Sequence, residues 1–216
     1  MTTHVLLITD KSGSMGPLAG DVINGFNSYL NDLESDADDW SISSTLFDTS
    51  VTEHCQAVSL AEVPRLNAFN YKPSGFTALL DAVYSSVTSL ESKLEAMSDT
   101  GRVLVIVQTD GAENSSREVN FRQVSELIQR LEATGRWEFL FVGQGPGAWH
   151  TGRSSGFSNR VDTQPGGMSV NNSYGSYATA SRAFRDGDSM AAVVDFMEQE
   201  HRKTGTMGSG EGAAAS

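Results

Sequence analysis

The stretch "LLITDKSGSM", residues 6–15, joins an apolar run to a set of oxygen side chains, and it decides the fold class. Residues 4–10 are apolar and rich in β-branched side chains, without the alternation of a strand that has one face in water. They therefore predict a buried strand in the middle of a sheet. Asp10 ends this strand, and Ser12 and Ser14 follow it in strict alternation.

Further along the chain, strand patterns alternate with helix patterns. β-prone runs predict strands at 40–48, 51–58, 102–110, 136–143 and 159–163. Apolar residues at helical spacing predict helices over 22–33, 79–94, 121–131, 173–185 and 188–203. This order predicts an α/β fold: a doubly wound, Rossmann-like, mainly parallel sheet with helices on both faces. The short turn between 40–48 and 51–58 predicts a hairpin, which adds one antiparallel strand at the sheet edge.

Oxygen side chains recur where the predicted strands end. Asp110 ends the strand 102–110 as Asp10 ends the first, and ligands of such sheets bind beyond the carboxyl ends of the strands. An extended chain points alternate side chains the same way, so Asp10, Ser12 and Ser14 can face one point. Thr77 lies at the start of the predicted helix 79–94. These residues are expected to meet at one edge of the sheet.

Two carboxylates and three hydroxyls form an all-oxygen set, which hard divalent cations prefer. Mg²⁺ is the first choice, with Mn²⁺ or Ca²⁺ as alternatives. Each segment alone has a simpler interpretation: a polar turn at Asp10 to Ser14, a helix cap at Thr77 and a turn after Asp110. The three together, in order and each at the end of a strand or helix, favour a metal site built from Asp10, Ser12, Ser14, Thr77 and Asp110.

The chain resembles a von Willebrand factor type A (VWA) domain with a metal-ion-dependent adhesion site (MIDAS). The resemblance rests on "DKSGSM" with Asp10, Ser12 and Ser14, on "GFTALLDA" with Thr77 and on "TDGAEN" with Asp110. The order of elements over residues 4–142 also follows the family. Many members carry a second glycine directly before the threonine, where this chain has Phe76, so the rim that a ligand meets is expected to differ.

The resemblance implies protein binding rather than catalysis. A partner protein's Glu or Asp would complete the coordination of the metal, and intracellular members of the family often work within larger assemblies. One alternative is a metal that only stabilises the loops. Another is a phosphoryl-transfer enzyme with Asp10 as nucleophile, but Ser12 then stands where such enzymes carry their general acid, which a hydroxyl cannot replace at neutral pH.

Two other segments allow alternative functions. The glycine-rich "VGQGPGAW", residues 142–149, follows a strand but lacks the G-x-G-x-x-G spacing of a dinucleotide site, so it is interpreted as a loop on the rim of the metal face. The apolar stripe of the helix 188–203 could hold a partner or pack on the chain's own sheet.

Composition limits the remaining classes. The 216 residues predict one domain over 1–204 and a flexible Gly/Ala/Ser-rich tail over 205–216. The formal net charge of −12 argues against binding to nucleic acid or to anionic membranes. The acids of 32–39 are expected to lie on the solvated surface, and the single cysteine, Cys55, is expected to be structural. The first apolar run is too short for a signal peptide or membrane span, so a cytoplasmic protein is expected.

Overall fold

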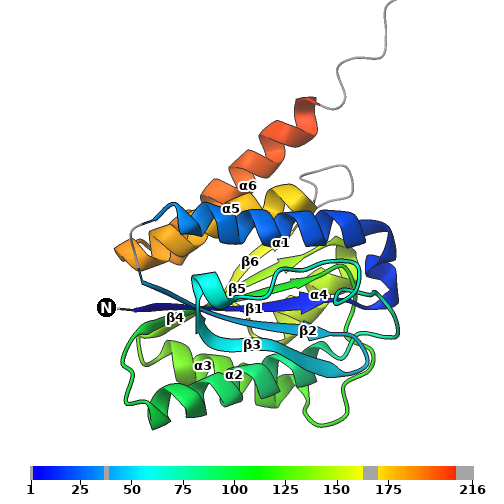
Figure 1. Ribbon diagram of the computed structural model, residues 1–216. Helices are drawn as coiled ribbons and strands as arrows, with labels where there is room; N and C mark the ends of the chain where they lie inside the picture. The colour runs from blue at the N-terminus through cyan, green and yellow to red at the C-terminus, as the bar shows by residue number, and fades with distance from the viewer. Residues whose placement is uncertain (1, 37–38, 163–169, 208–216) are drawn as a thin grey trace, which may run out of the picture.

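The computed structural model describes residues 2–36, 39–162 and 170–207, and in these residues six strands form one sheet (Figure 1). The strand order is β3-β2-β1-β4-β5-β6, and every neighbouring pair is parallel except the antiparallel pair β2/β3. The strands are β1 (Thr3–Asp10), β2 (Trp40–Phe47), β3 (Val51–Ser59), β4 (Arg102–Thr109), β5 (Trp137–Gly143) and β6 (Asn159–Asp162). The predicted mainly parallel sheet with one antiparallel edge strand is confirmed.

Six helices cover the sheet in the described part of the chain. They are α1 (Ala19–Glu34), α2 (Leu79–Ala96), α3 (Phe121–Glu132), α4 (Gly145–Ser154), α5 (Val170–Asp186) and α6 (Met190–Met207), with short 3-10 turns η1 (Gly13–Leu18) and η2 (Leu60–Glu62). Figure 1 shows α1, α5 and α6 on one side of the sheet and α2 and α3 on the other. None of the described helices has the length and apolar character needed to cross a membrane.

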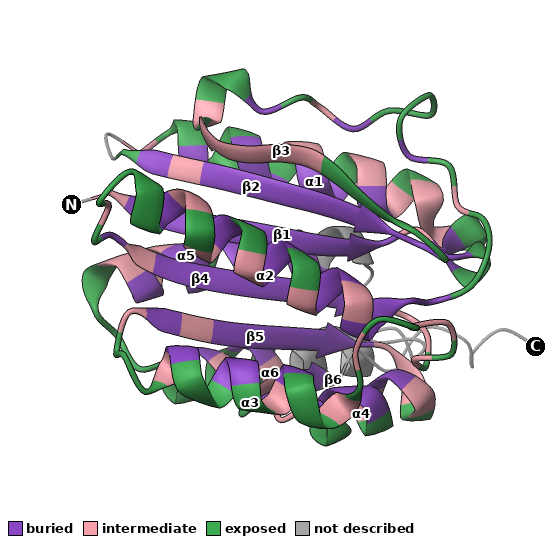
Figure 2. Ribbon diagram, turned by 90° about the horizontal axis from the view of Figure 1, so that it is seen from below, coloured by how far each residue is buried: buried purple, intermediate pink, exposed green. Residues whose placement is uncertain are grey.

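The central strands are buried on both faces, which explains their unbroken apolar sequences. All eight residues of β1 and seven of the eight residues of β4 are buried (Figure 2). Val5 and Leu7 face the core under α1 and α5, whereas Leu6 and Ile8 face the core under α2 and α3. Strand β1 lies between β2 and β4 and runs parallel to both. Its last residue, Asp10, therefore lies at the carboxyl edge of the sheet.

Local sequence signals explain several helix ends and contacts. Asn120 caps α3 by accepting a hydrogen bond from the Gln123 backbone at 3.2 Å, while the Gln123 side chain accepts from the Asn120 backbone at 3.0 Å. Gly25 of α1 lets α5 approach closely, since a Cβ there would lie 2.3 Å from the Tyr174 ring. Cys55 is half-buried in β3, and burial raises the pKa of its thiol to about 11, which agrees with a structural role.

The glycine-rich segment after β5 differs from its prediction. Residues 145–154 form α4 rather than a loop, because Pro146 stands in the first turn of a helix, where its fixed φ and missing N–H are tolerated. The segment does border the predicted metal edge: a Cβ on Gly147 would lie 3.0 Å from the Cβ of Ala112, two residues after Asp110. The predicted strand at 159–163 is present as β6, and residue 163 lies outside the described residues.

The last helix packs on the chain's own core. Met190, Val193 and Met197 are buried in the cluster that lines the α1 side of the sheet, so this apolar stripe is not a free docking surface. Helix α6 continues to Met207, whereas the predicted tail was expected to start at residue 205. Residues 208–216 of that tail lie outside the described residues.

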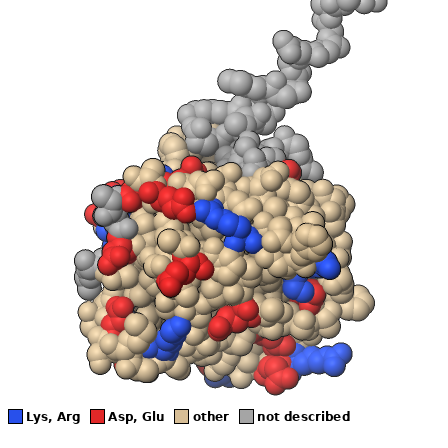
Figure 3. Space-filling view, viewed as in Figure 1, with Lys and Arg blue, Asp and Glu red and all other residues tan. Residues whose placement is uncertain are grey.

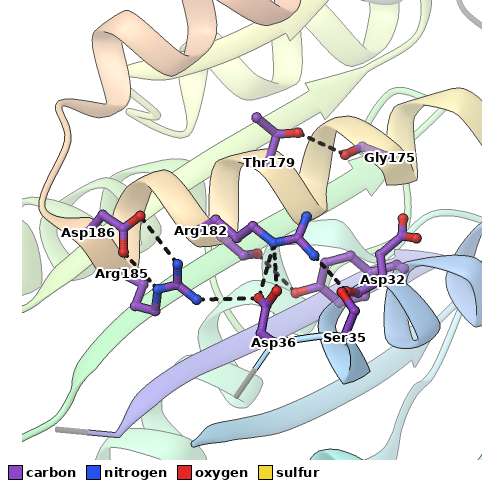
Figure 4. A network of polar contacts seen from close by, with 10 residues as sticks. Asp32, Ser35, Asp36, Gly175, Thr179, Arg182, Arg185 and Asp186 are labelled. Carbon is purple, nitrogen blue, oxygen red and sulfur yellow. Dashed lines mark hydrogen bonds and ion pairs between the residues drawn. The ribbon is translucent and has the colours of Figure 1, made fainter. Parts of the chain in front are cut away.

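One acid of the run 32–39 is not on the solvated surface as predicted. The Asp36 side chain is only 13% exposed, and both of its oxygens lie 3.1 Å from Nε of Arg182 (Figure 4). Arg185 adds a contact at 3.3 Å, so α5 is tied to the end of α1. The prediction failed because the partners lie about 150 positions along the chain, at separations of 146 and 149. Residues 37 and 38 lie outside the described residues.

Other acids do lie on the surface. Figure 3 shows Asp and Glu side chains spread over one face of the molecule, with Lys and Arg side chains among them. The formal charge of −12 is thus not gathered into a single acidic patch on that face. A cation site must therefore depend on the local arrangement of particular oxygens rather than on the general acidity of the chain.

Candidate metal centre

Asp10 forms the buried floor of the predicted site. It ends β1 with no exposed surface, and both carboxylate oxygens are held by its own chain. The Ser12 backbone N–H donates to Oδ1 at 2.6 Å, and the Thr109 hydroxyl donates to Oδ2 at 2.6 Å. The carboxylate is therefore fixed between the loop that follows β1 and the end of β4.

The two serines connect Asp10 to the second predicted acid. The Ser12 and Ser14 hydroxyl oxygens lie 3.2 Å apart. Ser12 is extended, but the 3-10 turn η1 begins at Gly13, so the predicted extended alternation ends before Ser14, and the hydroxyls meet across the start of this turn. The Ser14 hydroxyl then donates to Oδ1 of Asp110 at 2.6 Å. The end of β1 and the end of β4 thus share one polar network, although Ser14 and Asp110 are 96 positions apart.

Thr77 lies beside the same network, on the other side of Gly111. A Cβ on Gly111 would lie 3.2 Å from Oγ1 of Thr77 and 3.9 Å from Oγ of Ser14, so both hydroxyls flank this glycine. Thr77 is 3% exposed and is not a helix cap, because α2 begins after Ala78. Its backbone N–H donates to Oδ1 of Asn114 at 2.9 Å, which fixes it against the loop after Asp110.

The structure therefore brings all five predicted oxygen side chains to one edge of the sheet. This arrangement agrees with their predicted role, and that role as metal ligands remains a prediction. In the described residues, neither Asp10 nor Asp110 forms an ion pair with a basic side chain of the chain, and Lys11 pairs instead with Asp48. Burial raises the pKa of Asp10 to about 6, and hydrogen bonds from Thr109 and Ser12 offset part of the rise.

The donor set fits a small, hard divalent cation. A cation would supply the positive charge that no side chain of the described chain supplies to these two acids. Among those same residues there is no group of three or more His, Cys, Asp or Glu side chains that could hold a metal. Two carboxylates with three hydroxyls match the oxygen ligands that Mg²⁺ takes.

The loop after Asp110 is held by acids that the sequence interpretation missed. Both carboxylate oxygens of Asp81 accept backbone N–H groups, from Arg117 at 2.8 Å and from Glu118 and Val119 at 3.0 and 3.1 Å. Its position in the first turn of α2 was a usable signal, since acids are favoured there. Its contacts with the loop 117–119 could not be predicted, because they join residues 36 to 38 positions apart.

Glu113, which lies in the loop after Asp110, also accepts backbone N–H groups and so links this loop to α2. Its carboxylate accepts backbone N–H groups of Ser115 and Ser116 at 2.8 and 2.7 Å and that of Leu80 at 2.9 Å. The last contact satisfies one of the free N–H groups at the start of α2. The segment that carries Asp110 and the helix that follows Thr77 are thereby joined.

The loop before Thr77 is fixed to the loop that follows β1. The Tyr71 hydroxyl donates to the Asp10 carbonyl at 2.6 Å, and the Gly13 N–H donates to the Gly75 carbonyl at 3.1 Å. Gly75 has a φ of +68°, and a Cβ there would lie 2.6 Å from Oγ1 of Thr49, so no larger residue fits this turn.

Solved structures with a similar fold support the predicted architecture. The chain is similar to a von Willebrand factor type A structure from Catenulispora acidiphila, with a TM-score of 0.59 and 12% identity over 83% of this chain and 42% of that one. It is similar to the manganese-loaded TRAP protein of Plasmodium vivax, with a TM-score of 0.55 and 20% identity over 81% of this chain and 71% of that one.

A third similar structure is proximal thread matrix protein 1 from the mussel byssus with a zinc-occupied MIDAS motif. Its TM-score is 0.54 at 15% identity, over 90% of this chain and 45% of that one. The chain thus spans less than half the length of the Catenulispora and mussel proteins. No protein-family model and no curated protein sequence matches it. With its sheet order and these structural similarities, this chain has the fold of a von Willebrand factor type A domain.

Proposed function

We propose that this chain is a divalent-metal-dependent protein-binding module. Mg²⁺, or Mn²⁺ or Ca²⁺ in its place, would be held by Asp10, Ser12, Ser14, Thr77 and Asp110, and a partner's Glu or Asp would complete its coordination. The observation that carries the proposal is the continuous contact from Asp10 through Ser12 and Ser14 to Asp110, with Thr77 beside Gly111. The metal supplies a positive centre that attracts a carboxylate.

Two similar structures support a divalent ion in this fold: one is a manganese-loaded protein and the other has a zinc-occupied MIDAS motif. In this chain, the small hydroxyl ligands favour Mg²⁺. A cytoplasmic location, and membership of a larger assembly, belong to the same proposal.

Binding is favoured over catalysis by the state of Asp10. A phosphatase nucleophile must reach the substrate phosphorus directly, but Asp10 has no exposed surface and its two oxygens accept from Ser12 and Thr109. A metal role does not need such direct contact, because Mg²⁺ keeps several of its waters and a carboxylate can hold it through one of them. Ser12 also occupies the general-acid position with a hydroxyl. We therefore propose that the chain is not an enzyme.

Titration calorimetry with MgCl₂ tests the metal site. Asp10→Ala and Asp110→Ala are each expected to lose measurable Mg²⁺ binding while keeping the circular dichroism spectrum of the unmodified chain. Asp188→Ala is the matched control, because this acid is exposed between α5 and α6. Mg²⁺ affinity that is unchanged in both site variants would contradict the assignment.

Capture of partner proteins from the native cell tests the role of the metal. Binding is expected to disappear in a chelator, to return with Mg²⁺ or Mn²⁺, and to be lost in the double variant Ser12→Ala, Ser14→Ala. A metal that only stabilises the loops predicts another result: the chelator lowers the melting temperature, but the folded chain still captures the same partners.

A further inference from the structure

A groove begins beside the predicted metal ligands and runs along α2. Its first part is a cavity of about 350 Å³, within the range that occupied ligand sites have. Thr49 and Ala78 line its near end, and Ala78 directly follows Thr77. A chain segment bound at Thr77 can therefore enter the groove within one or two residues.

The groove is partly apolar. Val51 of β3 and Tyr84 of α2 form its walls, and Val51 is 37% exposed although it is a β-branched apolar residue. The charged residues that line this cavity are Asp81, Arg117 and Glu118, so the cavity has no excess of positive charge. Val51 and Ser85 also line a second cavity of about 280 Å³ between β3 and α2, so the groove continues away from the metal edge.

Phe76 adds apolar surface at the entrance. It immediately precedes Thr77 and is 66% exposed, although exposed aromatic side chains cost solvation free energy. Its backbone N–H donates to Oγ1 of Thr49 at 2.9 Å, so its backbone is fixed beside a residue that lines the groove. Phe76 and Val51 are two of the few large apolar residues that the described chain exposes.

We infer that the groove receives the partner segment that carries the metal-bound acidic residue, and that this segment has an apolar side chain next to the acid. The inference rests on the proposed function and adds the partner's sequence chemistry to it. The acid would lie at the metal, the apolar side chain against Phe76 and Val51, and the continuing chain along α2.

Two nine-residue synthetic peptides test the inference. Both have a central glutamate, which is flanked on each side by two leucines in one peptide and by two serines in the other. In saturating Mg²⁺, the unmodified chain is expected to bind the leucine peptide about tenfold more tightly, as partial burial of one leucine predicts. Fluorescence polarisation of labelled peptides gives both dissociation constants.

Two variants place the effect in the groove. In Phe76→Ser and Val51→Ser, the preference for the leucine peptide is expected to fall below about threefold, while Mg²⁺ affinity and binding of the serine peptide stay unchanged. Both side chains are exposed, so the fold should tolerate serine. Met97→Ser is the matched control: this exposed residue follows the opposite end of α2, about 27 Å along an 18-residue helix.

The possible results separate this inference from the proposed function. Equal Mg²⁺-dependent binding of both peptides would overturn the inference and leave the metal-dependent module standing. A leucine preference that persists in both groove variants would also overturn it. If neither peptide binds the Mg²⁺-saturated chain, the carboxylate-binding function itself is wrong, and the inference fails with it.

Discussion

Two polar clusters at opposite ends of α1 differ in what neutralises their acids. At the end of the helix, Asp36 is enclosed by Arg182 and Arg185 (Figure 4). Near its start, Asp10 and Asp110 meet only hydroxyls and backbone N–H groups of the described chain. The first cluster carries its own cations, whereas the second has donors for its oxygens but no positive charge.

This difference indicates what each cluster contributes. An acid that is paired within the chain has its charge neutralised by that pair, and removing one partner destabilises the fold. Such an acid leaves no coordination capacity for an external ion. Two acids without a basic partner repel each other at low dielectric and become more stable when a cation arrives. The Asp36 cluster is therefore structural, and the Asp10 cluster is the one suited to binding.

Placing a basic side chain beside Asp10 and Asp110 should have the largest effect on Mg²⁺ affinity. Ser14 is exposed and lies 2.6 Å from Asp110, so Ser14→Lys can place an ammonium group between the acids. We expect Mg²⁺ affinity to fall by at least about a hundredfold and the melting temperature in chelator to rise. Ser14→Met is the control for length, and it should lose affinity without gaining stability. Tight Mg²⁺ binding by the lysine variant would contradict the comparison.

Loosening the loop 117–119, which is held by Asp81, should lower Mg²⁺ affinity by a smaller factor. Asp81→Ala removes the acceptor of three backbone N–H groups from residues 117–119 without changing any predicted ligand. Mg²⁺ affinity, measured by calorimetry, is expected to fall about tenfold, as for other residues that orient metal ligands. Asp81→Asn keeps one acceptor oxygen, so its Mg²⁺ affinity should fall less than that of Asp81→Ala. Equal losses in the two variants would mean that the charge, and not loop positioning, matters.

Breaking the paired cluster should change stability and leave metal binding intact. Asp36→Ala is expected to lower the free energy of unfolding in urea by about 1–2 kcal/mol, since its arginine contacts are partly exposed to solvent. Mg²⁺ affinity should not change, because α1 is a 16-residue helix about 24 Å long. Asp32→Ala is the control, since only its backbone carbonyl meets Arg182. A change in Mg²⁺ affinity would show that the clusters are coupled.

The smallest effect is expected from the pH dependence of an acid at the opposite edge of the sheet. A hydrogen bond from the Gly101 backbone N–H holds the pKa of Asp99 below its ordinary 3.8, and a contact with His4 contributes a smaller lowering. The charged form therefore stabilises the folded chain above that pH, and this contribution disappears as the pH falls through the folded-state pKa. The stability difference between the unmodified chain and Asp99→Asn should be below about 1 kcal/mol at pH 6 and shrink toward pH 3. A difference that grows on acidification would contradict this.

The sequence predicted those features that depend on neighbouring residues. The buried strand β1 and the Asn120 cap follow from short-range geometry. The extended path predicted through Asp10, Ser12 and Ser14 was wrong at Ser14, which lies in the 3-10 turn η1. The sheet edge that brings Asp110 to the first loop follows from the rule for parallel sheets. Thr77 was placed by its position before a helix and by the family resemblance.

Features that depend on distant partners could not be predicted in this way. The ion pairs of Asp36 and the loop contacts of Asp81 join residues that no local pattern relates. The helix α4 was not predicted for a different reason: its glycines favour a loop, whereas the proline in its first turn is compatible with a helix start.

The spread of the site along the chain also has a kinetic consequence. Tyr71 meets Asp10 across 61 positions and Ser14 meets Asp110 across 96, so the oxygens converge only after most of the sheet has assembled. An ion held there would bind after the rate-limiting step of folding, so it is expected to slow unfolding while leaving the refolding rate nearly unchanged. Stopped-flow refolding that accelerates with Mg²⁺ would show that these loops close early. If the refolding rate is unchanged, metal availability in the cell would set the lifetime of the folded chain more than its yield.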